Sequence, residues 1–212
     1  MTRNARAGIR ARALASNPIA LLAGLSDAPG MEFFCYHRDR PGSASLRAQT
    51  VEQHWSYMDQ FARTMIARGP TFLDNGTLTG SVHILDLENP RAARDFAFDE
   101  PGYQSGTYRD VMVRRWANVL GRTMWDFRSP QPDSSAYLIL GFSLDPAAAD
   151  TELPSGDNVI AAGQLLSDDG SLVLGAAVLL EALNAGQAQG VLSTGRYTGV
   201  EVHRWRPGGR PN

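Results

Sequence analysis

The sequence predicts an α+β fold in which one chain carries two diverged copies of a ferredoxin-like βαββαβ unit. Two internal matches lead to this prediction. Residues 106–116 align without a gap with residues 195–205, with identical residues at six of the eleven positions. Residues 67–76 resemble residues 161–170, in the same order along the chain and at a similar separation. Because matches that recur in order indicate a repeated structural unit, the two parts of the chain are expected to fold alike.

The first copy, at residues 31–116, is predicted to contain four strands. Val111 and Val113 alternate with polar side chains, as in a half-buried strand. Asp74-Asn75-Gly76 is typical of a hairpin turn, because these residues tolerate positive φ. The four strands are expected near residues 32–38, 70–74, 79–87 and 107–116.

Two helices are predicted to connect these strands. A long helix is expected over residues 43–67, where apolar side chains recur at spacings of four and three and form one stripe that packs on the sheet. The stripe consists of Val51, Trp55, Met58, Ala62 and Met65. A second helix is expected over residues 89–98, because Asn89 is a favourable N-cap and Pro90 suits the first helical position.

The second copy, at residues 136–206, keeps the four strands but has lost its first helix. Only residues 146–160 remain between its first two strands, and they include Pro154-Ser155-Gly156. Residues 117–135 are interpreted as a connector and residues 207–212 as a tail. The strands are expected near residues 136–143, 163–167, 172–181 and 196–205.

Each predicted sheet has one apolar face that its own helices do not cover. The two sheets are therefore expected to face each other within one chain. Such a chain supplies both halves of the assembly and can be a monomer that is internally a pseudo-dimer. A homodimer formed through an outer face is the alternative.

Composition and charge argue against several classes of partner. The formal net charge of −2 and the pI near 6.1 give no general attraction to nucleic acid or to anionic membranes. No apolar run approaches the ~20 residues of a transmembrane helix. The single cysteine, Cys35, cannot form an internal disulfide, which fits a cytoplasmic location. The arginine-rich residues 1–30 are interpreted as a flexible N-terminal extension, with a secretion signal as the minor alternative.

Several short motifs of the first copy occur in a recognisable order. They are Asp39-Arg40-Pro41-Gly42, Arg47, His54, Arg68-Gly69-Pro70, Gly80-Ser81, Glu100-Pro101 and Gly106. With these motifs the chain resembles the YCII-related family of the dimeric α+β barrel superfamily, over residues 31–116 well and over residues 136–206 weakly. Ordinary members of that family are single units that pair as homodimers. The resemblance therefore implies a pseudo-dimeric α+β barrel within this chain.

The resemblance also implies a pocket that works without cofactor or metal. In such a pocket a histidine and a nearby carboxylate act as acid–base partners on a small molecule, and this role carries over to His54. The family commonly has aspartate before the proline of the later motif. This chain has Glu100 at that place with Asp99 beside it, so either carboxylate is a candidate partner.

Comparison of the two copies separates the remaining candidates. His54 has no counterpart in the second copy, and Arg47, seven residues earlier on the same helix face, could bind an anionic group of the substrate. Asp39 and Asp74 have the counterparts Asp145 and Asp168, which favours structural roles for both. The aromatic residues expected to line the pocket, or else to pack in the core, are Tyr36, Phe72 and Tyr103, together with Trp55.

The function predicted from these residues is a cofactor-free enzyme that moves a proton next to a carbonyl-type group. A dehydratase or related lyase is the first choice, with a hydrolase or a cofactor-independent monooxygenase as enzymatic alternatives. A non-catalytic small-molecule-binding or interaction protein is the third alternative. His37, His83 and His203 do not have the spacing of metal ligands, and the sequence has no glycine-rich phosphate loop and no G-x-S-x-G elbow.

Overall fold

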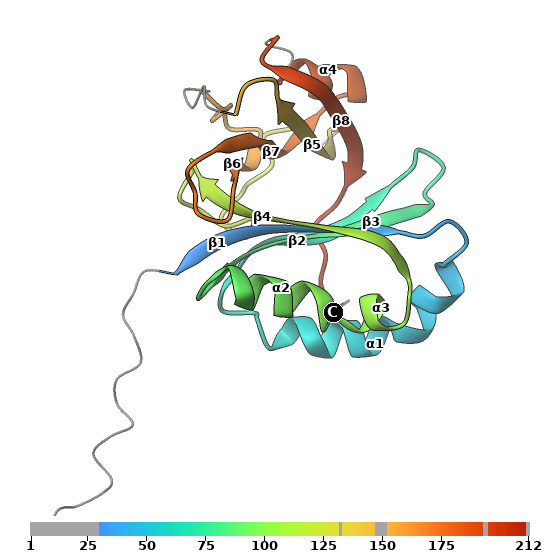
Figure 1. Cartoon of the computed structure of the whole chain (residues 1–212). Coiled ribbons are helices and arrows are strands. Elements are labelled where there is room, and N and C mark those ends of the chain that lie inside the picture. Colours follow the sequence, from blue (N-terminus) through green and yellow to red (C-terminus); the bar gives the residue numbers. More distant parts are fainter. Residues whose placement is uncertain (1–29, 132, 147–151, 193–194, 211–212) are drawn as a thin grey trace, which may run out of the picture.

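The computed structural model describes residues 30–131, 133–146, 152–192 and 195–210 (Figure 1). Residues 1–29 of the predicted N-terminal extension and residues 211–212 of the predicted tail lie outside the described residues. The division of the chain into two repeats, a connector and a tail stays a prediction.

The first part of the chain follows the order βαββαβ with one additional short helix. Its elements are β1 (Met31–Asp39), α1 (Ala44–Asp59), β2 (Met65–Phe72), β3 (Leu78–Leu87), α2 (Pro90–Phe98), α3 (Pro101–Gln104) and β4 (Tyr108–Asn118). The second part has the same order of strands with a short helix before the last one. Its elements are β5 (Ser135–Ser143), β6 (Val159–Leu166), β7 (Val173–Ala182), α4 (Ala185–Gly190) and β8 (Tyr197–Trp205).

The eight strands form one closed barrel in the order β1-β3-β2-β8-β5-β7-β6-β4, and every neighbouring pair is antiparallel. Each half contributes four adjacent strands, in the equivalent orders β4-β1-β3-β2 and β8-β5-β7-β6. The α+β prediction is therefore confirmed. Two ferredoxin-like units form a pseudo-dimeric α+β barrel within one chain.

The two seams between the halves have equivalent registers. At one seam β2 pairs with β8 and Thr71 lies opposite Trp205; at the other, β6 pairs with β4 and Leu165 lies opposite Trp116. Trp116 and Trp205 are the last residues of the longer internal match. The aligned segments therefore form the same contacts in the two halves.

Each seam tryptophan packs against a glycine that leaves no room for a side chain. A Cβ at Gly69 would overlap the indole of Trp205 and the carbonyl oxygen of Arg206. A Cβ at Gly163 would overlap the indole of Trp116. The two glycines also correspond in the shorter internal match, so close approach at the seams explains why both copies keep glycine here.

We expect Gly69→Ala and Gly163→Ala each to lower the free energy of unfolding by about 1–3 kcal/mol, because the added methyl group forces apart a packed indole and a strand. Gly199→Ala on β8 is the matched control, since its Cβ would meet nothing within 4 Å. Urea unfolding of the three variants measures the effect. Equal stability of all three would contradict the packing at the seams.

The first sheet separates two layers of side chains, because successive residues of a strand point to opposite faces. Phe34 and Ile84 belong to the core inside the barrel. Phe33 and Leu85 belong to a second core that includes residues of α1 and α2. Figure 1 shows α1, α2 and α3 on one face of this sheet and the second half of the chain on the other.

Three boundaries differ from the predictions. In the second half, β6 begins at Val159 instead of near residue 163. The long helix ends at Asp59 instead of near residue 67, and β2 begins at Met65 instead of residue 70. Ala62 is exposed in the turn between them, while Met65 is buried as a strand residue, so the predicted stripe holds only to Met58. An apolar residue at helical spacing can equally well be the first buried residue of the next strand, so the helix was predicted to end too late. As predicted, the described residues between β5 and β6 contain no helix.

Candidate active site

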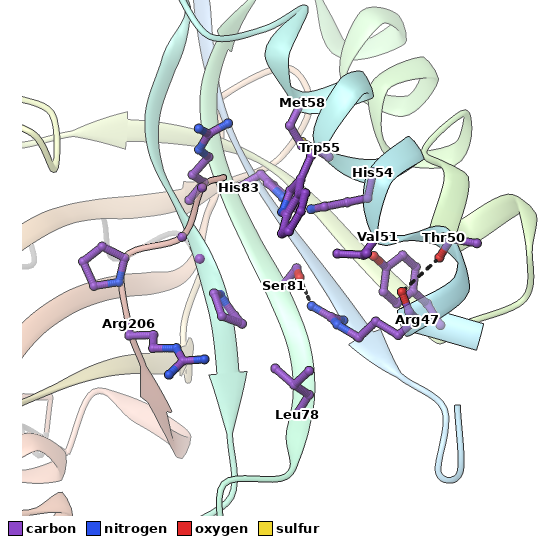
Figure 2. A pocket seen from close by; sticks show the side chains of 17 residues that line it. Arg47, Thr50, Val51, His54, Trp55, Met58, Leu78, Ser81, His83 and Arg206 are labelled. Atoms are coloured by element: carbon purple, nitrogen blue, oxygen red, sulfur yellow. Dashed lines mark hydrogen bonds between the residues drawn. The ribbon is translucent and has the colours of Figure 1, made fainter. Parts of the chain in front are cut away.

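Polar side chains of the first sheet face helix α1. Arg68 on β2 lies directly opposite His83 on β3, and Ser81 lies two residues before His83, so all three side chains leave the same face of the sheet. Figure 2 shows His54 pointing from α1 toward His83. The helix and the sheet thus bring basic and hydroxyl groups together outside the barrel interior.

A pocket of about 310 Å³ lies between α1 and this face of the sheet. Apolar parts of its wall come from Val51, Trp55 and Met58 on α1, from Pro70 on β2 and from Leu78 on β3. The predicted helical stripe therefore forms one wall of a pocket as well as part of the core. The volume suits a small organic molecule.

The segment after β8 closes one side of the pocket. Residues 206–209 belong to its wall, and a backbone N–H of this segment donates to the carbonyl oxygen of Arg68 at 2.9 Å. Arg210 then contacts α1 through ion pairs with Glu52 and Asp59 at 2.7 and 2.9 Å. The residues interpreted as a tail thus form a wall of the pocket, and the second half of the chain supplies it.

His54 and Glu100 form a close pair at the pocket. The Nδ1 atom of His54 lies 2.6 Å from Oε1 of Glu100, whose side chain is fully buried. Because an ionised carboxylate only accepts hydrogen bonds, Nδ1–H of His54 is the donor. Nε2 is then the ring nitrogen that remains for a molecule in the pocket.

A backbone donor also holds Glu100 in this position. Its Oε2 accepts the backbone N–H of Tyr103 at 2.9 Å, which makes Glu100 the N-cap of α3. Burial acts to raise the pKa of Glu100, but the hydrogen bond and charge of His54 outweigh it, and the pKa is lowered. Glu100 is therefore an ionised, fixed acceptor at neutral pH.

Two further histidines lie behind His54. The ring of His83 is 5.7 Å from that of His54 and 5.5 Å from that of His37, measured between centroids. His37 donates from Nε2 to the carbonyl oxygen of Ala97 at 2.9 Å, whereas Nδ1 of His83 is buried without a partner. Burial lowers the pKa of His37 and of His83, so both are neutral at pH 7.

Arg47 lines the pocket but already has protein partners. Its guanidinium contacts Asp39 at 2.6 Å and donates to the hydroxyl of Ser81 at 2.5 Å (Figure 2). Burial raises the pKa of Asp39 even though Arg47 acts in the opposite direction. Asp39 therefore binds Arg47 instead of a ligand, and the carboxylate of Asp39 balances the positive charge of Arg47.

Asp99 and Tyr103 do not join the pocket. Asp99 is exposed at the C-terminal end of α2, so Glu100, and not its neighbour, is the carboxylate that contacts His54. The ring of Tyr103 packs on Phe98 at the surface. Asp99 precedes and Tyr103 follows Glu100 closely, but neither side chain lines the pocket.

Three other candidates lie on the barrel side or at a seam. Tyr36 is buried inside the barrel, where its hydroxyl bonds to that of Thr71 at 3.1 Å. Phe72 and Asp74 lie at a separate depression beside the seam between β2 and β8. Asp74 is exposed and pairs with Arg204 at 3.8 Å. Strand alternation sends Tyr36 to the face opposite the pocket, so Tyr36 takes the other expected place, in the core.

The sequence reasoning did not identify Arg68, His83 or Tyr108 as residues of the pocket. The comparison of the two copies could have identified the first two. Register pairs Ala162 with Val178 in the second half, where the first half pairs Arg68 with His83. Polar side chains that become apolar in the copy without His54 are not required by the fold.

Among the described residues, no group of three or more histidine, cysteine, aspartate or glutamate side chains could hold a metal ion. No helix in the described ranges is long and apolar enough to cross a membrane.

Residues 31–117 match the YCII-related domain. A curated relative, an uncharacterized protein from Haemophilus influenzae, is 29% identical over 97 residues, which cover 42% of this chain and 99% of that protein. Residues 31–117 include all the residues that line the pocket except the segment 206–209.

Among solved structures, the chain is similar to 5-chloro-2-hydroxyhydroquinone dehydrochlorinase (TftG) from Burkholderia phenoliruptrix AC1100, solved in complex with 2,5-dihydroxybenzoquinone. The identity is 28%, the match covers 41% of this chain and 94% of that chain, and the TM-score is 0.39. A candidate monooxygenase from Lactobacillus acidophilus NCFM matches 84% of this chain and 94% of its own, with 10% identity and a TM-score of 0.46. Another, from Fusobacterium nucleatum, matches 86% and 94%, with 6% identity and a TM-score of 0.48.

Proposed function

We propose that this chain, whose residues 31–117 match the YCII-related domain, is an enzyme that uses His54 as general acid and base on a small carbonyl-containing molecule. One observation carries the proposal: His54 lines the pocket while its Nδ1 lies 2.6 Å from a buried, ionised Glu100. A fixed histidine of this kind presents one defined nitrogen to a substrate.

The two residues have separate roles. Glu100 accepts the hydrogen bond that Nδ1–H of His54 donates, and so fixes the tautomer in which Nε2 has a free lone pair. When Nε2 takes a proton from a carbon next to the carbonyl group, the imidazolium that forms is stabilised by the Glu100 carboxylate. His54 is therefore the catalytic residue, and Glu100 positions it.

Elimination of water is the reaction class that we favour. Nε2 of His54 removes the proton, the electron pair of the C–H bond forms the carbon–carbon double bond, and the C–O bond to the leaving hydroxyl breaks. The same nitrogen then donates its proton to the hydroxyl, which leaves as water. One histidine that faces the substrate can perform both transfers, and no oxidant or reductant is needed.

The test uses the natural substrate pool. Extracts from a strain that lacks the gene are incubated in D₂O with the purified wild-type protein, and the products are analysed by mass spectrometry. We expect at least one metabolite to lose the mass of water or to gain solvent deuterium at carbon. His54→Gln should lower this turnover by about 10²–10⁴-fold, as removal of a general base does.

His203→Gln is the matched control, because His203 lies on β8 and pairs with Glu201. It should leave turnover unchanged. Wild-type-like turnover in His54→Gln would reject the proposed role of His54. A product that contains an oxygen atom from O₂ would indicate the monooxygenase alternative, and a product that gains water would indicate hydrolysis. If no metabolite depends on the protein at all, the chain is a binding protein.

A further inference from the structure

Arg68 is a cation of this pocket to which the described residues offer neither an ion pair nor an aromatic ring. Arg47 is bound to Asp39, and Arg206 stacks over the ring of Phe72 at 4.4 Å. Within the described ranges Arg68 forms no ion pair, and its Nε is buried without a hydrogen-bond partner. A partly desolvated guanidinium with unused donors is costly unless a ligand satisfies it.

A second unsatisfied group lies beside it. His83 is opposite Arg68 in the sheet, only 2% exposed, and has a buried Nδ1 without a partner. Burial and the nearby positive groups, Arg68 included, keep its ring neutral, so it can donate one hydrogen bond. A permanent cation and a neutral donor thus face the same pocket from neighbouring strands.

The fold itself does not demand either residue. The positions equivalent to Arg68 and His83 in the second half are Ala162 and Val178, which lie in a core under the second sheet. Apolar side chains are therefore stable at these positions of the barrel. The polar pair occurs only in the half that also contains His54, which is the pattern expected of a binding function.

We propose that Arg68 binds a carboxylate group of the substrate and that His83 donates a hydrogen bond to the same group. A guanidinium matches a carboxylate through two parallel N–H donors. The apolar wall of Val51, Trp55 and Pro70 then holds the body of the molecule. The substrate class is a small carboxylic acid with a flat or apolar body. Calling this acid a substrate rests on the proposed function.

The placement also agrees with the chemistry assigned to His54. The rings of His54 and His83 are 5.7 Å apart, so a carboxylate held beside His83 presents its adjacent carbon toward His54. His54, acting as general base, would remove a proton from that carbon. Arg68 and His83 therefore bind and orient the acid, while His54 acts on it.

The test uses calorimetry to measure how benzoate and benzamide bind to the full-length protein. Benzamide has the same shape as benzoate but no charge. Benzoate should bind the wild type, and Arg68→Gln should weaken its binding by about tenfold or more, as loss of a charge-assisted pair does. Arg91→Gln is the control, because it removes an arginine charge from an exposed position on α2, and it should keep wild-type affinity. Benzamide should bind all three proteins weakly.

Three results would overturn this proposal: no benzoate binding to the wild type at millimolar concentrations, equal affinity in Arg68→Gln, or equal binding of benzamide. A thermal melt of each variant confirms that it is folded. Arg68→Lys keeps the charge but loses the planar guanidinium, so its benzoate affinity should fall between those of the wild type and Arg68→Gln.

The two proposals fail separately. His54→Gln should retain benzoate affinity, because His54 does not touch the carboxylate in this arrangement. If turnover depends on His54 but benzoate binding does not depend on Arg68, only the carboxylate site is wrong. If benzoate binding depends on Arg68 but no turnover depends on His54, the pocket binds acids and the proposed enzymatic function is wrong.

Discussion

Glu100→Leu is expected to lower the free energy of unfolding by about 3–5 kcal/mol, as the loss of one partner of a buried charged pair does. The leucine leaves two donors without an acceptor: Nδ1–H of His54 and the N–H of Tyr103. It also removes the N-cap of α3. Urea unfolding at pH 7 measures the change.

Glu100→Gln should separate the structural and catalytic roles of this residue. Its amide oxygen still accepts hydrogen bonds, so the loss of stability should be smaller than for leucine. The neutral amide no longer stabilises an imidazolium at His54, and we expect turnover to fall by about 10²–10⁴-fold. Asp99→Asn is the control, because Asp99 is exposed one residue earlier. An unchanged rate in Glu100→Gln would show that Glu100 does not position the catalytic histidine.

The protein is expected to lose stability as the pH falls below about 6.5, the ordinary pKa of histidine. The pKa values of His37 and His83 are lowered in the folded state by burial. The unfolded chain therefore takes up protons first as the pH falls. The stability that the two neutral rings contribute is fully present above the histidine pKa of the unfolded chain. It declines as the pH falls from that value toward the lower pKa of the folded state, by up to about 1.4 kcal/mol per pH unit for each ring.

Urea unfolding of the wild type and of His37→Gln and His83→Gln at intervals between about pH 8 and pH 5 tests this dependence. Each variant should show a shallower loss of stability than the wild type, because glutamine cannot be protonated. The comparison cancels the contributions of Asp39 and Glu100, which are common to all three proteins. Gly199→Ala, which changes no titrating group, is the control and should keep the wild-type slope. Parallel curves for all four proteins would contradict the buried, neutral state of His37 and His83.

Sequence patterns were sufficient for most of the fold. Alternation, turn residues and the two internal matches predicted all eight strands, although β2 begins at Met65 and not at residue 70, and β6 begins at Val159 and not at residue 163. Gly69 and Gly163 with their tryptophans show why the matches were informative, since each match contains residues of a seam. The end of α1 was placed too late because helical and strand periodicities both accept Met65.

The candidate site was only partly predictable. His54 was identified from the family resemblance and from its absence in the second copy, but the choice between Asp99 and Glu100 depended on the turn into α3. Tyr36 and Phe72 were chosen as aromatic residues without knowledge of the face they occupy. Arg68 and His83 were missed because their meaning depends on being opposite each other in the sheet.

Local patterns of a few residues predict the kinds of secondary structure, their order and their repetition. The pocket between α1 and the outer face of the sheet, the pairing of Glu100 with His54, and the closure of the pocket by residues 206–209 appear only in the folded chain. These features join residues that lie far apart in the sequence. Closure of the barrel fixes their distances, and no local pattern encodes them.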